Sequence, residues 1–537
     1  MIGVIPKPHQ IPVVEEFFEL FKTPWELHRP GRRYDVVVAT ADDLPNVDAR
    51  LLLVFGSETK TTDAAHGIVA GSRRRGMLFD YRGRSLPMYG PVLTFGNRET
   101  AIRELVVPDC SSPAVIRLGY DLFDEVRLLL SAGQPVEHAH IPSLDLHIAM
   151  LRDWILNAGI PLLEIPPVPA GHSFISCLTH DIDFVGIRLH RFDRTMWGFL
   201  YRSTIGAVRN LLRRRISVAR VLQLWRAALS LPFVYLGWAR DFWEPFDWYL
   251  RAEHGLPATY FLIPFKQRAG EHVPGRHGSR RATAYDITGL SHRTATLMQA
   301  GCEVGVHGID AWHSVDKGRD ERARVTRVTG EPAAGTRSHW LLHDVATPSV
   351  LEQAGYVYDS TVGYNETVGY RAGTTQVFRP LGARVLLELP LHIQDGALFY
   401  PNRLDLSEAE AEKRCRALIG NAERFGGVLT VLWHDRSHGP ERFWGHFYAG
   451  LLSALRSSDA WFGTASQVVD WFRRRREVHF ESVVTPDGPR TSVRHDGDEI
   501  RPPLRIRVHH GPSKFVDMAL NGRFAVDVDL IGLGSPS

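Results

Sequence analysis

Two aspartates at the end of an apolar run are the first residues in this chain that could do chemistry. Asp181 and Asp183 close the segment SFISCLTHDID, 173–183. In extended backbone, side chains two residues apart share one face, so both carboxylates project together while Ile182 packs the other way. Two adjacent carboxylates repel each other unless a cation or a proton lies between them. An isolated pair of this kind is more often a turn or a helix cap than a site, so other groups must decide its role.

Histidines and an arginine near the ends of other apolar runs could complete such a site. His307 lies near the end of the run CEVGVHGID, and Asp310 and His313 follow it within six residues. Imidazole nitrogen and carboxylate oxygen are both ligands that zinc accepts. His434 ends the run GVLTVLWH, and Arg337, within GTRSHWLLHD, could pair with a carboxylate or hold an anion. For any one of the 25 histidines, a structural role remains the commoner alternative.

The elements that must position these side chains are strand-like runs separated by longer segments with helical periodicity. The runs are SFISCLTHDID, ATYFLIPF, CEVGVHGID and GVLTVLWHD. This arrangement is typical of β/α units whose strands are buried on both faces. In such folds the chemistry lies at the carboxyl ends of the strands, and the Asp and His residues stand at those ends.

Two changes of pattern divide the chain into three predicted parts. Residues 1–170 alternate short β-rich runs with turn clusters and end in IPLLEIPPVPAG, which cannot continue a helix. They are predicted to form a small α/β domain, whose role the sequence does not indicate. Residues 171–476 carry the strand-end Asp and His residues and form the predicted catalytic domain. Residues 477–537 show short β-rich runs between Pro, Gly and Asp turns and predict a small β appendage.

The order and spacing of these motifs resemble the polysaccharide deacetylases of the NodB-homology class, carbohydrate esterase family 4, in their D-x-D variant. The resemblance covers roughly residues 173–475 and touches all five motif regions of that family. The segment GYVYDSTVGYNETVGYRAGT, 355–374, also resembles a subgroup that carries an N-terminal domain of its own. The resemblance implies an α/β fold built on a distorted (β/α)7-type barrel.

The resemblance implies a divalent metal, with zinc as the expected ion. Asp183 matches the family's metal-binding Asp, and His307 matches the first of its two metal-binding histidines. The second histidine of the family lies four residues later, where this chain has Ala311. The third ligand is therefore expected to be His313 or, as the alternative, Asp310, and the softer imidazole favours His313.

The same resemblance assigns the proton-transfer roles. Asp181 matches the catalytic base, and Arg337 matches the arginine that orients it. His339 and Trp340 follow Arg337 in place of the family's usual Pro-aromatic pair. His434 matches the general acid that protonates the leaving amine.

Three further residues are candidates for contact with the substrate. Leu432 matches the family residue that lines the acyl pocket. Tyr370 and Arg371 lie in a Gly-rich loop, where they line a sugar cleft or only pack the loop. The family's fourth motif lies near LELPLH, 387–392, and lacks its usual Trp.

The function implied is that of a metal-dependent hydrolase acting on a carbon–nitrogen, non-peptide bond. Its substrate would be an N-acetylated amino sugar in a polysaccharide, an oligosaccharide or a carrier-linked precursor. Because the second and third motifs depart from the family pattern, two alternatives stay open. One is a hydrolase of another linear or cyclic amide on the same scaffold, and the other is a non-catalytic carbohydrate-binding descendant.

Composition limits the class of protein and its partners. Hydrophobic residues make up 44% of the chain and charged residues 23%, which excludes wholesale disorder and fibrous folds. A net charge of +3 is too small to indicate a nucleic-acid-binding surface.

The start lacks a signal-peptide pattern and no apolar run reaches the ~20 residues of a membrane span, so we expect a cytoplasmic protein. The four cysteines are widely spaced, as expected for free, buried thiols. The oligomeric state is not indicated.

One segment is strongly basic. Residues 186–240 contain eleven Arg against the single Asp193, a local formal charge of +10. A solvated helix face that also covers the core explains such a segment, and it is the commoner case. The functional alternative is a surface for anionic lipid, nucleotide-sugar phosphate or acidic polysaccharide, which would make the protein membrane-peripheral.

Overall fold

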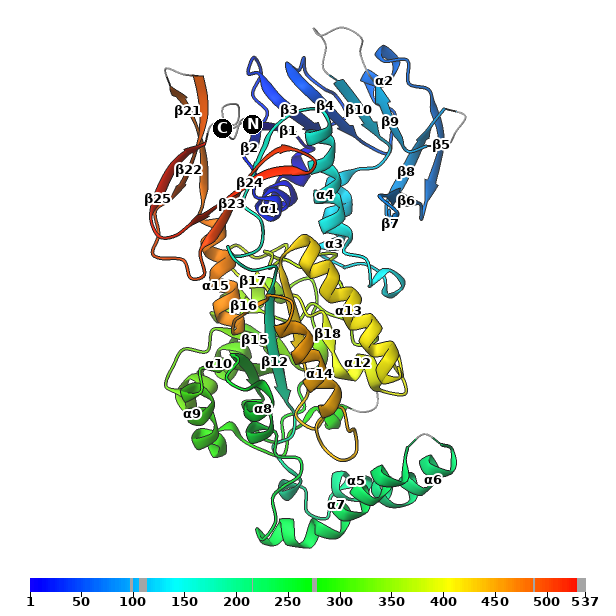
Figure 1. The fold of residues 1–537 in the computed structure, drawn as a ribbon, viewed down its shortest axis with the longest axis vertical. Helices are drawn as coiled ribbons and strands as arrows, with labels where there is room; N and C mark the ends of the chain where they lie inside the picture. The colour runs from blue at the N-terminus through cyan, green and yellow to red at the C-terminus, as the bar shows by residue number, and fades with distance from the viewer. Residues whose placement is uncertain (97–99, 106–113, 215, 273–277, 486–487, 529–537) are drawn as a thin grey trace.

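The computed structural model describes residues 1–96, 100–105, 114–214, 216–272, 278–485 and 488–528 (Figure 1). Its centre is a sheet in which every strand pair is parallel, in the order β17-β16-β15-β14-β13-β12-β19-β18, with β20 also pairing with β12. Within the described residues β17 does not pair with β18, so the barrel stays open. The parallel α/β arrangement expected from the strand-end pattern and the barrel-type sheet implied by the resemblance are both confirmed. The strands are β12 (Ile175–Ile182), β13 (Ala258–Leu262), β14 (Glu303–Gly308), β15 (Gly335–Ser338), β16 (Tyr358–Asp359), β17 (Leu387–Glu388), β18 (Ile393–Gln394), β19 (Val428–Leu432) and β20 (Trp461–Phe462).

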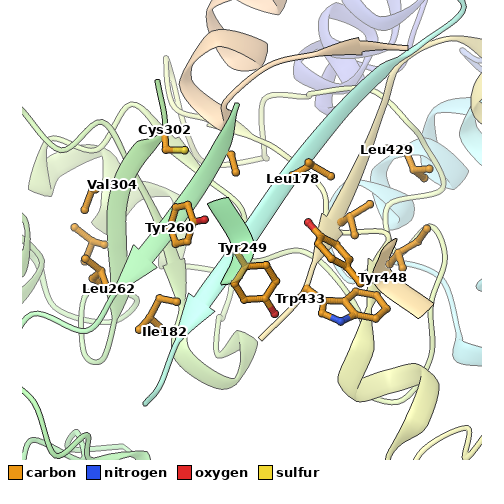
Figure 2. Close-up of a cluster of buried hydrophobic side chains, with 14 of the residues drawn as sticks. Leu178, Ile182, Tyr249, Tyr260, Leu262, Cys302, Val304, Leu429, Trp433 and Tyr448 are labelled. Atoms are coloured by element: carbon orange, nitrogen blue, oxygen red, sulfur yellow. The ribbon is translucent and has the colours of Figure 1, made fainter. Parts of the chain in front are cut away.

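Burial on both faces explains why these runs form central strands. All eight residues of β12 are buried, and Figure 2 shows Leu178 and Ile182 on the face where Tyr249 and Trp433 also pack. Amphipathic helices supply the outer layer, as expected of parallel β/α units. They are α8 (Phe246–Glu253), α9 (Ser291–Gln299), α10 (Val315–Thr329), α11 (Thr347–Ala354), α13 (Glu408–Phe425), α14 (Gly445–Arg456) and α15 (Ala465–Arg476), whereas the short α12 (Asp395–Phe399) is buried along its whole length.

The N-terminal part has its own sheet, in the order β2-β1-β3-β4-β10-β9, and a second hydrophobic core, to which Ala372 and Phe378 of the barrel part also contribute. Two of the short β-rich runs of this part form β3 (Tyr34–Ala39) and β4 (Ala49–Phe55). The other main elements are β1 (Ile2–Ile5), α1 (Ile11–Phe21), β2 (Trp25–Leu27), β9 (Ile102–Leu105), β10 (Ala114–Leu118), α3 (Leu122–Leu129) and α4 (Ser143–Asn157).

The C-terminal part pairs with the linker that ends the N-terminal part. The linker strand β11 (Leu162–Glu164) pairs with β23 (Leu504–Gly511), which pairs in turn with β24 (Lys514–Leu520). A second sheet contains β21 (His479–Thr485), β22 (Gly488–His495) and β25 (Phe524–Val528). The predicted β appendage is thus tied to the rest of the chain through a shared sheet.

Two smaller expectations can be compared with the structure. Cys177, Cys302 and Cys415 are free and buried, as predicted, and Cys110 lies outside the described residues. Of the helices that the structure describes, none combines the length and the apolar character that crossing a membrane requires.

Candidate functional site

The two aspartates lie at the carboxyl end of β12, where neighbouring parallel strands also end. Ile182 is fully buried in the core, and Asp181 and Asp183 both face His307 on β14. The alternation predicted from extended backbone therefore holds. His307 Nε2 lies 3.8 Å from Asp181 Oδ2 and 3.5 Å from Asp183 Oδ1.

Arg337, on β15, holds Asp181 in place. Its Nη1 donates to Asp181 Oδ1 at 3.0 Å, a charge-assisted hydrogen bond. The guanidinium is itself fixed, because Nε and Nη2 donate to the carbonyl and the hydroxyl of Ser360 at 2.9 and 2.8 Å. It also lies over the Phe261 ring, 4.6 Å from the centroid, and is fully buried. The Asp181 carboxylate is therefore oriented with Oδ2 towards His307.

Three side chains converge on one point beside Asp181. Asp183, His307 and His339 each offer one ligand atom, and these atoms lie within 4.8 Å of one another. His339 Nε2 is 3.2 Å from Asp183 Oδ1. Two imidazole nitrogens and a carboxylate oxygen form a donor set that fits zinc.

The hydrogen bonds around this group support a cation rather than a structural ion pair. His307 Nδ1 donates to the Arg337 carbonyl at 2.9 Å, which leaves Nε2 free to offer its lone pair. Burial lowers the pKa of His339 to about 3, so this imidazole is neutral. Asp183 Oδ1 is buried and has no hydrogen-bond partner among the described residues. A divalent cation would satisfy this oxygen and both nitrogens.

The structure corrects the predicted third ligand. His313 does not join Asp183 and His307, because its Nε2 turns towards Asp310 Oδ1 at 3.1 Å, in an exposed group with Glu271 and His272. The alternative, Asp310, also lies outside the buried group and accepts from the Glu271 amide.

The physical reason is the path of the chain after β14. Ala311, four residues after His307, is fully buried and packs close to Gly318 of α10, so its position has no room for an imidazole. Ser314 caps the start of α10 and directs the following residues away from the strand ends. His339 takes the third place in this group of candidate ligands, and it is not among the residues predicted for the site. The signal was present, since position 311, where the resemblance expects a histidine, is Ala, and a histidine follows Arg337 by two residues.

A tight turn after β15 brings His339 into the group. Trp340 and Leu341 have φ angles of 67° and 55°, left-handed conformations that cost about 1–3 kcal/mol each outside glycine. The buried Arg281 and the half-buried Asn365 hold this turn. Arg281 donates to the His339 carbonyl at 3.1 Å, and Asn365 donates to the Trp340 carbonyl at 3.0 Å.

His434 is held by a buried carboxylate, Asp395, which is not among the residues predicted for the site. Asp395 Oδ1 lies 2.5 Å from His434 Nδ1, and its Oδ2 accepts the His434 amide at 2.8 Å. Burial alone would lower the pKa of His434, but Asp395, Asp183 and Asp181 outweigh it and raise the pKa to about 9. Asp395 directly follows β18, so the strand-end rule that selected Asp181 also pointed to it.

Leu432 ends β19 and is almost fully buried. It forms a small apolar cluster with Leu341 and Leu391. Leu341 belongs to the turn that carries His339, so this cluster lies next to the group of three candidate ligands.

Tyr370 and Arg371 lie against the N-terminal part of the chain. Tyr370 is fully buried and its amide donates to the Ala139 carbonyl at 2.7 Å, so it cannot contact a substrate. Arg371 is half-buried, accepts from the Gln134 amide through its carbonyl, and donates to the Gly363 carbonyl at 3.0 Å. The loop-packing alternative therefore describes Tyr370, and the expected sugar contact is wrong for this residue.

Comparison with known proteins gives structural matches only. No family model and no curated protein matches the chain. Similar solved structures include a "putative polysaccharide deacetylase from Mycobacterium smegmatis" (18% identity, TM-score 0.33, 58% of this chain and 95% of that one). Others are a "probable Polysaccharide deacetylase from Pseudomonas aeruginosa PAO1" (13%, 0.35, 60% and 98%) and the PuuE allantoinase (12%, 0.35, 57% and 92%). Such low identities and TM-scores assign no activity, so function must be inferred from the residues of the site.

Proposed function

We propose that this protein is a metal-dependent hydrolase that removes the N-acetyl group from an amino sugar. The observation that carries the proposal is one constellation at the strand ends. An oriented carboxylate, Asp181, lies beside the three-ligand group. His434, partly buried and paired with the fully buried Asp395, lies close enough to both aspartates for their charge to raise its pKa. A base, a cation site and an acid are the three parts of metal-assisted amide hydrolysis.

Asp183, His307 and His339 would hold the metal, and zinc suits their nitrogen and oxygen donors. A divalent ion supplies Lewis-acid chemistry, in that it polarises a carbonyl and lowers the pKa of water. The protein prepares these ligands in advance. The Arg337 carbonyl fixes the tautomer of His307, and the turn after β15 fixes the position of His339.

Asp181 acts as the general base. Arg337 occupies its Oδ1, so Oδ2, on the side of His307, remains to accept a proton from the attacking water. General-base catalysis by an oriented carboxylate of this kind contributes about 10²–10⁴ in rate.

His434 acts as the general acid. Asp395 holds Nδ1 and keeps the ring protonated at neutral pH, which leaves the Nε2 proton for the departing amine. Without this proton the amine would have to leave as an amide anion. Leu432, Leu341 and Leu391 form the apolar contact proposed for the acetyl methyl group.

Acetate release tests the proposal. The protein would be reconstituted with zinc, cobalt or nickel and offered chito-oligosaccharides, peptidoglycan fragments, and lipid-linked and nucleotide-linked N-acetyl sugars. We expect release from at least one of these, and loss of release in Asp181→Asn.

Failure on every sugar, with metal shown to be bound, would overturn the proposal. Turnover of ureides without turnover of sugars would instead identify a hydrolase of another amide. Carbohydrate binding without bound metal, unaffected by Asp183→Ala, would identify a non-catalytic binding protein.

A further inference from the structure

The basic segment forms a helical hairpin that projects from the barrel. The Arg-rich hairpin, residues 187–240, contains α5 (Arg194–Tyr201), a π-helical turn at Arg202–Gly206, α6 (Ala207–Leu212) and α7 (Val218–Leu236). It is inserted directly after the end of β12. At the bottom of Figure 1 it extends away from the barrel on the side where β12 ends.

One face of each helix of the hairpin is used for internal packing. On α7 the buried residues Val221, Leu224, Leu231 and Val234 recur at helical spacing. They pack with residues from α5 and α6 in two small clusters, one of which includes the fully buried Trp243 at the base of the hairpin. The hairpin therefore has a core that needs no partner.

A second apolar face of the hairpin is exposed. In the described part of the chain, 24 large hydrophobic side chains are exposed, and 14 of them lie between Leu189 and Trp238. On α7 they recur three or four residues apart, on the side opposite the buried residues. On α5, the turn and α6 they follow a similar spacing. The stripes are Leu222, Trp225, Leu229, Phe233 and Leu236 on α7, and Trp197, Tyr201, Ile205, Val208 and Leu212 before it.

The two exposed stripes meet in a groove between the helices. The groove has a volume of about 820 Å³ and is lined by Ile205, Val208 and Leu212 on one side and by Trp225 and Leu229 on the other. Leu212 and Leu229 are 80% and 76% exposed. An apolar face of this size on a polar-rimmed element marks an interaction surface.

The charges around this face are almost all positive. Arg209 and Arg213 line the same groove. They are exposed, as are Arg194, Arg214 and Arg226, and none of the five has a carboxylate partner within the residues that the structure describes.

These charges indicate which kind of partner the exposed apolar face binds. A second copy of the chain would bring another strongly basic hairpin against this one, and the two would repel each other. A soluble acidic polymer would neutralise the arginines but leave the Leu, Trp and Phe side chains in water. An anionic bilayer accepts both, since apolar and aromatic side chains enter the interface while arginines contact lipid phosphates.

We propose that the Arg-rich hairpin is a docking element that lies in the interface of a membrane containing anionic lipid. The exposed stripes of α5 to α7 enter the boundary between headgroups and acyl chains, and the unpaired arginines bind the phosphates. Basic residues on the polar side and Trp, Phe and Leu on the apolar side are the combination typical of helices that lie in the membrane plane.

The hairpin contacts the loop that carries the proposed acid through Arg202, the first residue of its π-helical turn. Arg202 pairs with Glu441 at 2.7 Å, and Arg436 lies 3.9 Å from the ring centroid of Phe184, next to Asp183. Membrane docking would therefore hold the strand-end site near the lipid surface. That this favours an amino sugar on a lipid carrier rests on the proposed function, whereas the docking itself does not.

Vesicle sedimentation tests the docking directly. Full-length protein is mixed with vesicles of phosphatidylcholine alone or of equimolar phosphatidylcholine and phosphatidylglycerol. We expect binding only to the second kind, and weaker binding as salt is raised. Arg209→Gln with Arg213→Gln should weaken binding about 30-fold, from the contribution of each arginine near an anionic surface. Leu212→Glu with Leu229→Glu should abolish it.

Matched controls change equally exposed residues outside the hairpin. Val345→Glu with Val385→Glu, and Arg327→Gln with Arg384→Gln, should bind vesicles like wild type. Acetate release from a soluble substrate should be unchanged in all four double variants, which separates this proposal from the catalytic one. Wild-type protein that ignores phosphatidylglycerol, or hairpin variants that bind like wild type, would overturn the docking. Dimerisation abolished by Leu212→Glu with Leu229→Glu, in a wild type that binds no vesicles, would assign the face to a second copy.

Discussion

Two groups of histidine and acidic side chains lie in the described part of the chain, and both could hold a metal ion by the spacing of their ligand atoms. The first is Asp183, His307 and His339 at the strand ends. The second is Glu271, His272 and His313 on neighbouring loops. The two histidines of the first group are 2% and 5% exposed, whereas Glu271 and His272 lie at the surface.

The groups differ most in what surrounds them. In the first, His307 is oriented by a backbone carbonyl and Asp183 Oδ1 has no hydrogen-bond partner within the described residues. In the second, the Lys317 ammonium already contacts Glu271, so part of the negative charge is neutralised without a metal. Burial, orientation and unpaired acceptors therefore distinguish a prepared site from a surface cluster, where residue types alone do not.

The largest difference should appear when one carboxylate of each group is neutralised. Asp183→Asn should lose bound zinc and about 10³-fold or more in kcat/KM, because Lewis-acid stabilisation is worth several kcal/mol. Glu271→Gln in the surface group should match wild type. Zinc content and acetate release measure both. Equal losses in the two variants would remove the distinction between the groups.

Each group has a histidine–aspartate pair, His434 with Asp395 near the first and His313 with Asp310 at the second. Only the first pair should govern how activity depends on pH. The pKa of His434 is about 9, so the proposed acid is protonated at neutral pH and we expect activity to fall as pH rises through that value. Without the Asp395 carboxylate the pKa falls towards or below the ordinary ~6.5, so Asp395→Asn should move the alkaline limb to lower pH.

The matched control is Asp310→Asn, which removes the partner of His313. Its profile of kcat/KM against pH should keep the wild-type alkaline limb. A limb that stays near pH 9 in Asp395→Asn, or one that moves in Asp310→Asn, would show that His434 is not the acid.

A smaller effect should follow from loosening the turn that carries His339. Asn365→Ala removes the hydrogen bond to the Trp340 carbonyl and should weaken zinc binding about 10-fold, the low end for groups that orient a ligand. The exposed Asn402→Ala is the control. Competition with a chromophoric chelator measures both affinities, and equal affinities would show that the turn does not depend on this bond.

The sequence was sufficient for the main fold because the strands are buried on both faces. A short apolar run such as the one ending at Ile182 is best explained as a strand buried on both faces. The alternation of side chains along that strand then predicts that Asp181 and Asp183 share one face. The pairing of β11 with β23 could not be predicted, since it joins residues more than 300 positions apart through short strands with no distinctive pattern.

The candidate site was predictable only where it follows strand geometry. Asp181 and His307 lie on strands, Asp183 directly follows one, and the three meet as expected. Arg337 contacts Asp181. His339 depends on two consecutive left-handed residues, which no spacing rule reveals. The choice of His313 failed because a ligand four to six residues after His307 assumes a loop that returns to the site, and this loop leads into α10 instead.

The most direct test of the account is a comparison of zinc binding in His339→Ala and His313→Ala. Both variants remove one imidazole, from the buried and the exposed group respectively. Elemental analysis after dialysis against dilute zinc should find about one zinc per chain in wild type and in His313→Ala, and little or none in His339→Ala. Zinc that is retained in His339→Ala and lost in His313→Ala would contradict the proposed site.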